Sequence, residues 1–324
     1  MRRRQFITLL GGAAAWPLAA RAQQLSRMRL VEALFFGDTY RIAAALRQEL
    51  QRLGWVEGRN LRIDYRFSGN DLGRATAHAA ELVNLGPDVI FVVGSPAVQA
   101  VQQRTQTIPI VFVGGGDLSD NELTGGIARP AGNTTGFANT FNSIGGKYLE
   151  LLKDAAPRIT RVAHVARTFD GRTSELTAII GAAAAKLAIT IIREPFRNDA
   201  AEMGRAINAF AAEPNGALLM TGTRAPTPIS DAILRQAVQH QLPTMVGSGR
   251  VVREGILMSY GPDGRDLIHG AASYIDRILR GAKPTELPVQ FPTKIPLVIN
   301  LKTARALRLE IPPTLLALAD EVIE

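Results

Sequence analysis

Side chains that could hold a small charged or aromatic molecule occur in the turns that follow several predicted strands. Ser95 is the predicted N-cap of a helix and Pro96 its first residue, and the free backbone N–H groups and positive dipole end of such a helix start favour a carboxylate. A capped helix that serves stability alone explains these two residues equally well. Asp38 and Asp117 could bind an ammonium group, although both also suit turns and helix caps.

Other side chains in the same kind of turn extend this candidate set. Arg224 could pair with a carboxylate through two hydrogen bonds, or it could simply be solvated. Phe36, Phe169 and Tyr260 could stack on a ring, although Phe36 ends an apolar run and fits a core position as well. Gly116 would let the backbone approach a ligand closely. The predicted ligand-binding residues are Phe36, Asp38, Ser95, Gly116, Asp117, Thr168, Phe169, Thr223, Arg224 and Ser248.

The sequence lacks the common signatures of catalytic and metal sites. Gly247-Ser248-Gly249 has Val246 where a nucleophile elbow needs glycine, and Gly145-Gly146-Lys147 is followed by Tyr148 where a P-loop needs Ser or Thr. The absence of cysteine excludes disulfides and thiolate metal sites. The four histidines are isolated, and none has a metal-type partner at short spacing: His78, His164, His240 and His269. We therefore expect a protein that is not an enzyme and uses no cofactor.

Alternating apolar strands and amphipathic helices must position these turns. In the first part of the chain, strands are predicted at 29–36, 61–67, 88–93 and 108–113, with helices at 40–53, 72–85 and 97–104. This alternation implies a parallel sheet covered by helices on both faces. Ligands of such sheets bind outside the carboxyl ends of the strands, which is where the candidate residues stand.

The same alternation restarts after a polar, glycine-rich stretch at 132–144. Helices are predicted at 147–156, 175–187, 201–212 and 229–240, and strands at 161–166, 189–193, 216–220 and 243–246. The tail differs, with strands at 256–260 and 294–300, a helix at 265–280, and a final segment at 303–307. We therefore expect two similar arrays and a tail that could return to both.

Residues 1–22 have the pattern of an export signal. Arginines at positions 2–4 precede a short apolar stretch and a small-x-small site that ends at Ala22. The pair Arg3-Arg4, followed by Phe6-Ile7, fits the twin-arginine signal. No cysteine follows the site, so we expect an exported, soluble, periplasmic protein without a lipid anchor.

The charge of the remaining chain is modest. The formal net charge of the whole sequence is +8, and residues 1–22 contribute four arginines and no acid, which leaves 8 − 4 = +4. Arginine and lysine are scattered among aspartate and glutamate rather than gathered into a stripe. We therefore expect no nucleic-acid partner, and no later stretch is apolar enough to cross a membrane.

Several segments resemble the substrate-binding proteins of ABC transporters, in the branch related to tryptophan- and tyrosine-uptake binding proteins. The resemblance covers nearly the whole chain after the signal. It rests on LGWVEGRN at 53–60, TIPIVFV at 107–113, GNTTGF at 132–137, GILMSYG at 255–261, LPVQFPTK at 287–294, VINLKTA at 298–304 and IPPTLLA at 311–317. These motifs are mostly scaffold, so they do not specify the ligand.

The resemblance implies an α/β type I periplasmic binding protein, with two doubly wound parallel-sheet lobes joined by three crossings. The N-terminal lobe would comprise 23–135 plus 260–284, and the C-terminal lobe 136–259 plus 285–324. The three crossings would lie within 132–144, 249–262 and 281–294, so the helix at 265–280 would pack on the first lobe.

The family further implies that a small solute, such as a carboxylate or an amino acid, binds in the interlobe cleft by hinge closure. A monomer would then deliver the solute to an ABC permease in the cytoplasmic membrane. Two alternatives stay open: a periplasmic sensing module that reports to a membrane signalling receptor, and a secreted α/β enzyme.

Overall fold

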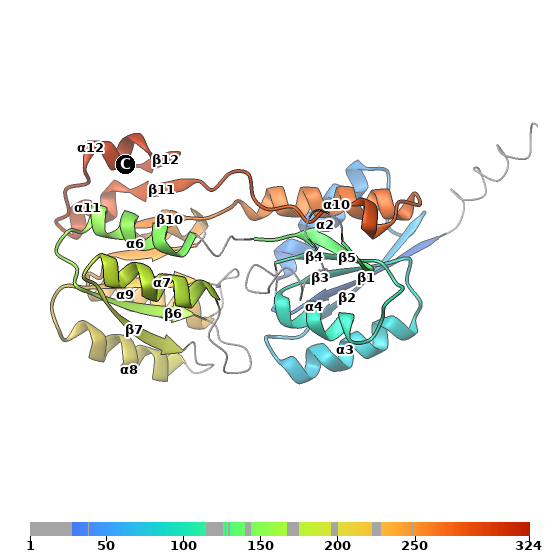
Figure 1. Ribbon diagram of the computed structural model, residues 1–324, viewed down its shortest axis with the longest axis horizontal. Helices are drawn as coiled ribbons and strands as arrows, with labels where there is room; N and C mark the ends of the chain where they lie inside the picture. Colours follow the sequence, from blue (N-terminus) through green and yellow to red (C-terminus); the bar gives the residue numbers. More distant parts are fainter. Residues whose placement is uncertain are drawn as a thin grey trace, which may run out of the picture.

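The computed structural model describes residues 28–37, 39–114, 126, 128, 130–139, 144–166, 175–195, 200–221, 228–247 and 249–324. The molecule is elongated and has one β-sheet at each end (Figure 1). The first sheet has the order β2-β1-β3-β4-β5 and the second the order β12-β11-β10-β9-β8-β6-β7. Neighbouring strands in the described parts of the two sheets are parallel except β10 with β11. This confirms the predicted α/β class.

The first sheet is buried on both faces, so its central strands are almost entirely apolar. One core lies between the sheet and helices α2 and α10 (Gly264–Leu279), and a second core lies between the sheet and helices α3 and α4. The elements are β1 (Arg29–Phe35), α2 (Tyr40–Arg52), β2 (Leu61–Phe67), α3 (Leu72–Asn84), β3 (Val89–Val93), α4 (Ser95–Gln102), β4 (Ile110–Val113) and β5 (Thr134–Phe137). All but β5 lie within a few residues of the predicted positions.

The second sheet is likewise covered on both faces, by α6 with α7 on one side and α8 with α9 on the other. Its strands are β6 (Arg161–Ala166), β7 (Thr190–Pro195), β8 (Gly216–Thr221), β9 (Thr244–Val246), β10 (Met258–Tyr260), β11 (Leu297–Asn300) and β12 (Glu321–Ile323). Its helices are α6 (Ile144–Ala155), α7 (Glu175–Lys186), α8 (Ala200–Ala211), α9 (Pro228–Gln239), η1 (Gly249–Glu254), α11 (Leu301–Ala306) and α12 (Pro313–Ala317). No helix in the described parts of the chain is long and apolar enough to cross a membrane.

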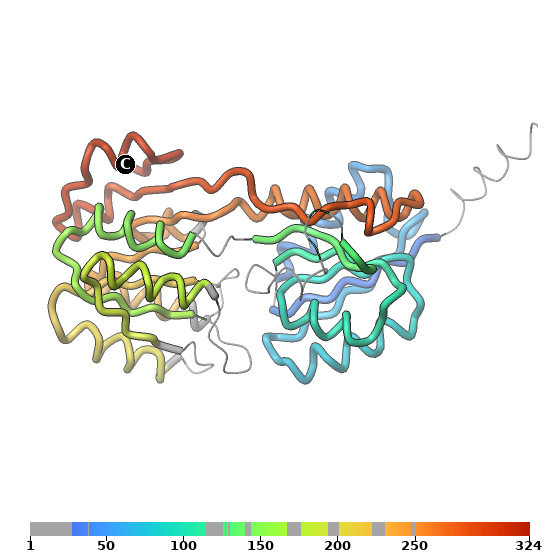
Figure 2. The backbone as a smooth tube through the Cα atoms, viewed as in Figure 1, coloured from blue at the N-terminus to red at the C-terminus, as the bar shows by residue number. Residues whose placement is uncertain are grey.

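The chain passes between the two sheets three times: after β5, between β10 and α10 (Gly264–Leu279), and between η2 (Pro284–Glu286) and β11. Figure 2 shows the second and third passages along the same side of the molecule. The third passage is bound to both of the others. Gln290 donates to Gly136 at 2.9 Å, Ala138 donates to Gln290 at 2.8 Å, and Gly261 donates to Pro296 at 3.3 Å, all between backbone groups.

The sheets divide the chain a few residues away from the expected lobe boundaries. Gly136 and Phe137, expected in the second lobe, pair with β4 in the first sheet. Leu287 packs in the core of the first sheet although it too was expected in the second lobe. Tyr260, expected in the first lobe, pairs with Leu297 in the second sheet. In each case, backbone pairing with a strand edge or packing in a core decides to which lobe the residue belongs.

Helix α10 packs against α2 and the first sheet, although it follows strands of the second sheet. Three side chains fasten this return. The Trp55 indole N–H donates to Asp276 at 2.8 Å, and Arg280 donates to the same carboxylate oxygen at 2.6 Å. The Arg280 guanidinium also lies 5.6 Å from the centre of the Trp55 ring, within the range of a cation–π contact.

Replacing Trp55 with Phe should lower the free energy of unfolding by about 1.5–3 kcal/mol, the value of a hydrogen bond to a charged group. Trp55 is only 7% exposed, so water cannot readily replace its N–H. Urea denaturation followed by circular dichroism measures the change. Arg52→Ala is the control, because it removes an exposed pair with Glu49 at 3.1 Å and should cost about 1 kcal/mol or less. Equal midpoints for the Trp55→Phe variant and the unchanged protein would contradict the prediction.

Candidate ligand-binding site

The parallel strands of both sheets run towards the middle of the molecule, so their carboxyl ends face each other (Figure 1). The described carboxyl ends of the parallel strands in both sheets therefore lie at the same central region, which is where ligands of such sheets bind. Of the ten predicted site residues, the structure describes Phe36 and Ser95. The other eight, which stay predictions, lie outside the described residues: Asp38, Gly116, Asp117, Thr168, Phe169, Thr223, Arg224 and Ser248.

Backbone hydrogen bonds continue past the strand ends of the first sheet. Phe36 donates to Val93 at 3.0 Å, and Gly94 donates to Val113 at 3.1 Å. Gly94 has φ 96°, and a Cβ at this position would lie 3.0 Å from the Cβ of Phe36. Glycine is therefore needed here both for the backbone conformation and for the contact with Phe36. These bonds give the carboxyl edge of the first sheet a fixed shape.

Phe36 lies in the core, which was the alternative to ligand contact in the sequence analysis. Its side chain is 5% exposed and belongs to the same apolar cluster as Leu34, Val92 and Phe112. The nearby loop after β2 is bonded to it, since the backbone N–H of Asn70 donates to the Phe36 carbonyl at 2.7 Å. Phe36 therefore packs beneath the carboxyl edge of the first sheet and stabilises it. Its contact with a ligand stays a prediction.

Ser95 is not the N-cap of α4, so that part of the sequence interpretation is wrong. Gly94 is the N-cap, and Ser95 is the first helical residue, with Pro96 second. The reason is that Gly94 readily adopts the positive φ at this turn, which moves the cap one residue earlier. The amides of Ala97 and Val98 donate to the Gly94 carbonyl at 3.1 Å, and Pro96 has no N–H. The helix start therefore has fewer amides for an anion than the sequence suggested.

The carboxyl edge of the second sheet carries a row of side chains on one face. Ala166 is in register with Thr221, and Val246 is in register with both Met220 and Ser259. The next positions along these strands, Thr221, Gly247 and Tyr260, therefore continue the row. Thr221 and Tyr260 both lie on the side of the sheet that α6 and α7 cover, because they alternate with residues of the opposite core.

A buried histidine fixes Thr221 within this row. The Nε2 atom of His164 lies 2.8 Å from the Thr221 hydroxyl oxygen, and the two residues are 2% and 4% exposed. Burial, assisted by the nearby Arg193, lowers the pKa of His164 to about 4. The imidazole is therefore neutral at neutral pH and serves as a hydrogen-bond partner rather than as a charge.

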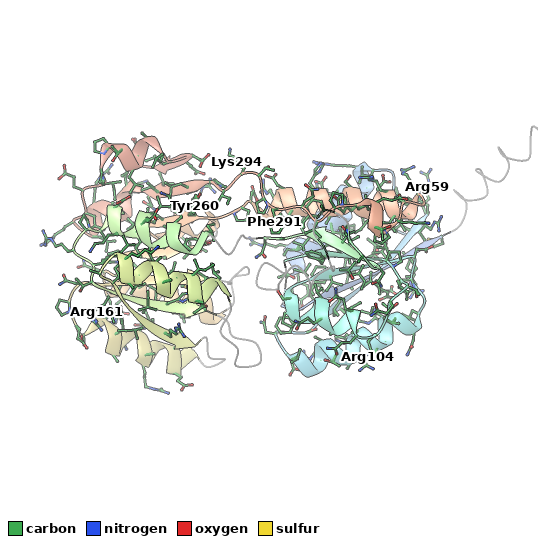
Figure 3. The ribbon with its side chains drawn as sticks, viewed as in Figure 1. Arg59, Arg104, Arg161, Tyr260, Phe291 and Lys294 are labelled. Atoms are coloured by element: carbon green, nitrogen blue, oxygen red, sulfur yellow. The ribbon has the colours of Figure 1, made fainter. Side chains whose placement is uncertain are left out.

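Two tyrosines complete the described part of this edge. The rings of Tyr148 and Tyr260 lie 6.3 Å apart at 83°, an edge-to-face contact. Tyr148 comes from α6, and its hydroxyl would lie 3.5 Å from a Cβ on Gly247. Figure 3 shows Tyr260 towards the inner end of the second lobe. Helical periodicity placed Tyr148 on a predicted helix but gave no signal that its hydroxyl reaches the end of β9.

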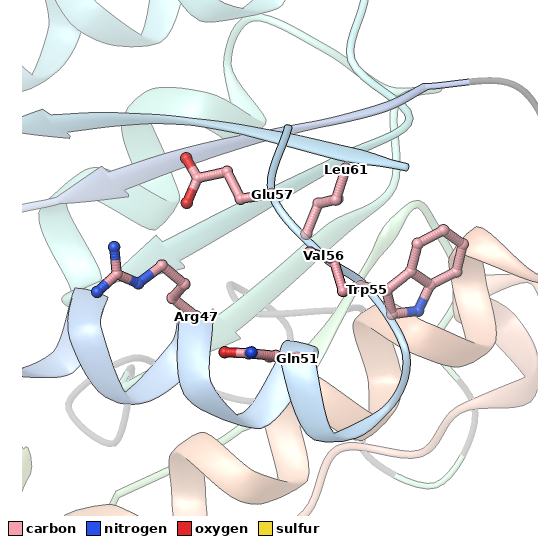
Figure 4. A pocket seen from close by; sticks show the side chains of 6 residues that line it. All are labelled: Arg47, Gln51, Trp55, Val56, Glu57 and Leu61. Atoms are coloured by element: carbon pink, nitrogen blue, oxygen red, sulfur yellow. The ribbon is translucent and has the colours of Figure 1, made fainter. Parts of the chain in front are cut away.

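A separate pocket of about 350 Å³ lies on the first lobe (Figure 4). It lies beside Leu61, the first residue of β2, so it is at the amino-terminal edge of the sheet, opposite the predicted site. None of the ten predicted residues lines it; the lining residues are Arg47, Gln51, Trp55, Val56, Glu57 and Leu61. Among the described residues there is no group of His, Cys, Asp and Glu that could hold a metal ion.

Comparison with known proteins gives a consistent result over nearly the whole chain. The model of a family described as ABC transporter substrate binding protein matches residues 37–323. The tyrosine-binding protein of Clostridioides difficile (strain R20291) is 22% identical over 261 residues, which cover 81% of this chain and 74% of that protein.

Solved structures with the same fold have type I periplasmic binding protein architecture, which confirms the predicted fold. A conserved domain protein from Vibrio cholerae superposes with a TM-score of 0.79 at 25% identity, covering 91% of this chain and all of the other. An ABC domain from Streptococcus pneumoniae in complex with L-Trp gives a TM-score of 0.77 at 21% identity, again over 91% of this chain and 100% of the other.

Proposed function

Because this chain belongs to the ABC transporter substrate-binding protein family, we propose that it takes up a small solute between its lobes and delivers it to an ABC permease. The observation that carries the proposal is the opposition of the two carboxyl edges, with His164–Thr221 and Tyr148–Tyr260 on one side and Phe36–Gly94 on the other. Closure of the lobes about the three crossings would bury the solute.

The proposed solute is a small molecule that carries a carboxylate, such as an amino acid. Two relatives support this class: one is named a tyrosine-binding protein, and the other contains L-Trp in its structure. Asp38, Asp117 and Arg224 are the proposed charged contacts, and the start of α4 at Ser95 is a further proposed contact for the carboxylate. The family is one of solute-binding proteins, and no catalytic role is proposed.

The lobes are proposed to comprise 23–135 plus 260–284 and 136–259 plus 285–324, with Gly136, Phe137 and Leu287 moved to the first lobe and Tyr260 to the second. Residues 1–22 are proposed to direct export through the twin-arginine route to the periplasm, where the protein would act as a monomer without a lipid anchor. The pattern that supports export is Arg3-Arg4 followed by Phe6-Ile7, with the small residues Ala20 and Ala22 at the cleavage site.

Isothermal titration calorimetry tests the function directly. Protein comprising residues 23–324 should bind at least one of L-tyrosine, L-tryptophan and L-leucine, and should ignore the matching amines, which lack the carboxylate. Adenine serves as a ring-containing solute without a carboxylate. Binding of a neutral solute with no response to any amino acid would contradict the proposed solute class, and the absence of binding by any small solute would contradict the function.

A further inference from the structure

Tyr260 lies at the carboxyl edge of the second sheet, directly before a crossing between the two lobes. It is the last residue of β10, and the next residue, Gly261, begins the second crossing between the lobes. Its ring packs partly against the core beneath α6 and remains partly exposed to solvent. A partly exposed aromatic ring at the carboxyl end of a parallel strand is positioned for contact with a bound molecule.

The surroundings hold this ring in one place. Tyr148 is 4% exposed and meets the Tyr260 ring edge-to-face at 6.3 Å. Gly247 lies beside Tyr260 in the row and has no side chain, and the Tyr148 hydroxyl comes within 3.5 Å of where its Cβ would be. A larger residue at 247 would separate the two rings from the end of β9. The glycine thus leaves the space that the tyrosine pair uses.

We infer that Tyr260 is a contact residue for the flat, apolar part of the solute, and that Tyr148 is a positioning residue that fixes the Tyr260 ring. This inference rests on the proposed function and adds a source of selectivity from the second lobe. A ring-bearing solute gains an aromatic contact from Tyr260 that an aliphatic solute of similar charge lacks. Tyr260 directly precedes the second crossing, so contact with it would also favour the closed arrangement of the lobes.

Calorimetric titration with L-tryptophan and L-leucine tests the assignment on three variants. Tyr260→Ala should weaken L-tryptophan binding by about tenfold or more while changing L-leucine binding by about threefold or less. Tyr260→Phe should keep both affinities within about threefold, because the ring rather than the hydroxyl makes the contact. Tyr148→Ala should reduce the tryptophan-to-leucine ratio in the same direction, and Tyr148→Phe should restore it.

Tyr65→Ala is the matched control, since it truncates a tyrosine that packs on Phe35 in the first sheet, at 6.5 Å between ring centres. It should leave the tryptophan-to-leucine ratio unchanged. Where Tyr260→Ala unfolds, Tyr260→Leu keeps the apolar bulk and should show the same loss of ratio. An unchanged ratio in folded Tyr260 variants overturns the assignment but leaves the function standing. If the protein without any substitution binds neither amino acid, the amino-acid proposal and this inference are both overturned.

Discussion

Replacing Arg66 with Met is expected to lower the free energy of unfolding by about 3–5 kcal/mol, because it leaves a buried carboxylate without its cation. Glu32 lies in the middle of β1 and is fully buried, and its Oε2 atom is bound by the Arg66 guanidinium from β2. Its Oε1 atom has no hydrogen-bond partner among the described residues. Loss of Arg66 therefore removes the counter-charge while the desolvation cost of the carboxylate remains. Urea denaturation at pH 8 measures the loss.

Two variants separate this effect from loss of a surface charge. Arg62→Met removes a neighbouring arginine that binds Asp64 at 2.6 Å but is 63% exposed, so it should cost about 1 kcal/mol or less. The double variant Glu32→Leu with Arg66→Met should recover most of the stability, since it removes both charges from the interior. Similar losses in Arg66→Met and Arg62→Met would refute the special role of the buried pair.

The same pair makes stability depend on pH. Burial raises the pKa of Glu32 to about 7, although the Arg66 charge opposes the rise and Asp64 adds to it. Glu81 lies 3.7 Å from Arg66 on the exposed side, and His78 lies 3.5 Å from Glu81. The folded state holds the Glu32 proton more tightly than the unfolded chain, in which the glutamate pKa is 4.5. The stability gained from this tighter proton binding is therefore full below about pH 4.5 and is lost as the pH rises through 7.

Glu32→Gln should remove this dependence, because glutamine has no proton to lose. The free energy of unfolding of the unchanged protein should fall between pH 5 and pH 8 more steeply than that of the Glu32→Gln variant. The loss caused by Arg66→Met should likewise be smaller at pH 5 than at pH 8, since a protonated Glu32 no longer needs the cation. Parallel pH profiles for the two proteins would show that Glu32 titrates in its ordinary range.

The sequence predicted most elements correctly because burial on both faces of a parallel sheet demands continuous apolar runs. The run at 89–93 and the amphipathic pattern at 40–52 leave little choice of structure. Strand β5 was missed because Thr134, Thr135 and Gly136 have the composition of a loop. The free edge of β4 nevertheless binds this backbone, and a Cβ on Gly136 would lie only 2.6 Å from the Phe112 nitrogen.

The site was harder to predict because it depends on neighbours that only strand register brings together. The sequence identified Ser95-Pro96 as a helix start, but it could not show that Gly94, with its positive φ, would take the cap. It identified Tyr260 as a ring but had no means of pairing it with Tyr148, which is distant in sequence. His164 was interpreted only as isolated, because its partner, Thr221, lies on a different strand.

Replacing Gly261 with Ala is expected to lower the free energy of unfolding by about 3 kcal/mol or more, at or beyond the upper end of ordinary overpacking. A Cβ at this position would run into the Gly247 carbonyl, with its carbon only 2.7 Å away. Both partners are backbone, so neither can turn aside as a flexible side chain would. The second crossing and the end of β9 must then separate, which would move Tyr260 away from Tyr148 and weaken solute binding.

Thermal unfolding and calorimetric titration of the same samples measure both consequences. Gly264→Ala is the matched control, because this glycine lies three residues later at the start of α10 and has no neighbouring atom within 4 Å of its Cβ position. Since alanine favours a helix over glycine, that variant should be as stable as the unchanged protein or slightly more so. Gly261→Ala should therefore melt at a clearly lower temperature than Gly264→Ala. Equal melting temperatures and equal solute affinities would mean that the second crossing and the end of β9 can separate at this point without cost. The close approach of Gly247 and Gly261 would then have no role in holding the carboxyl edge of the second sheet.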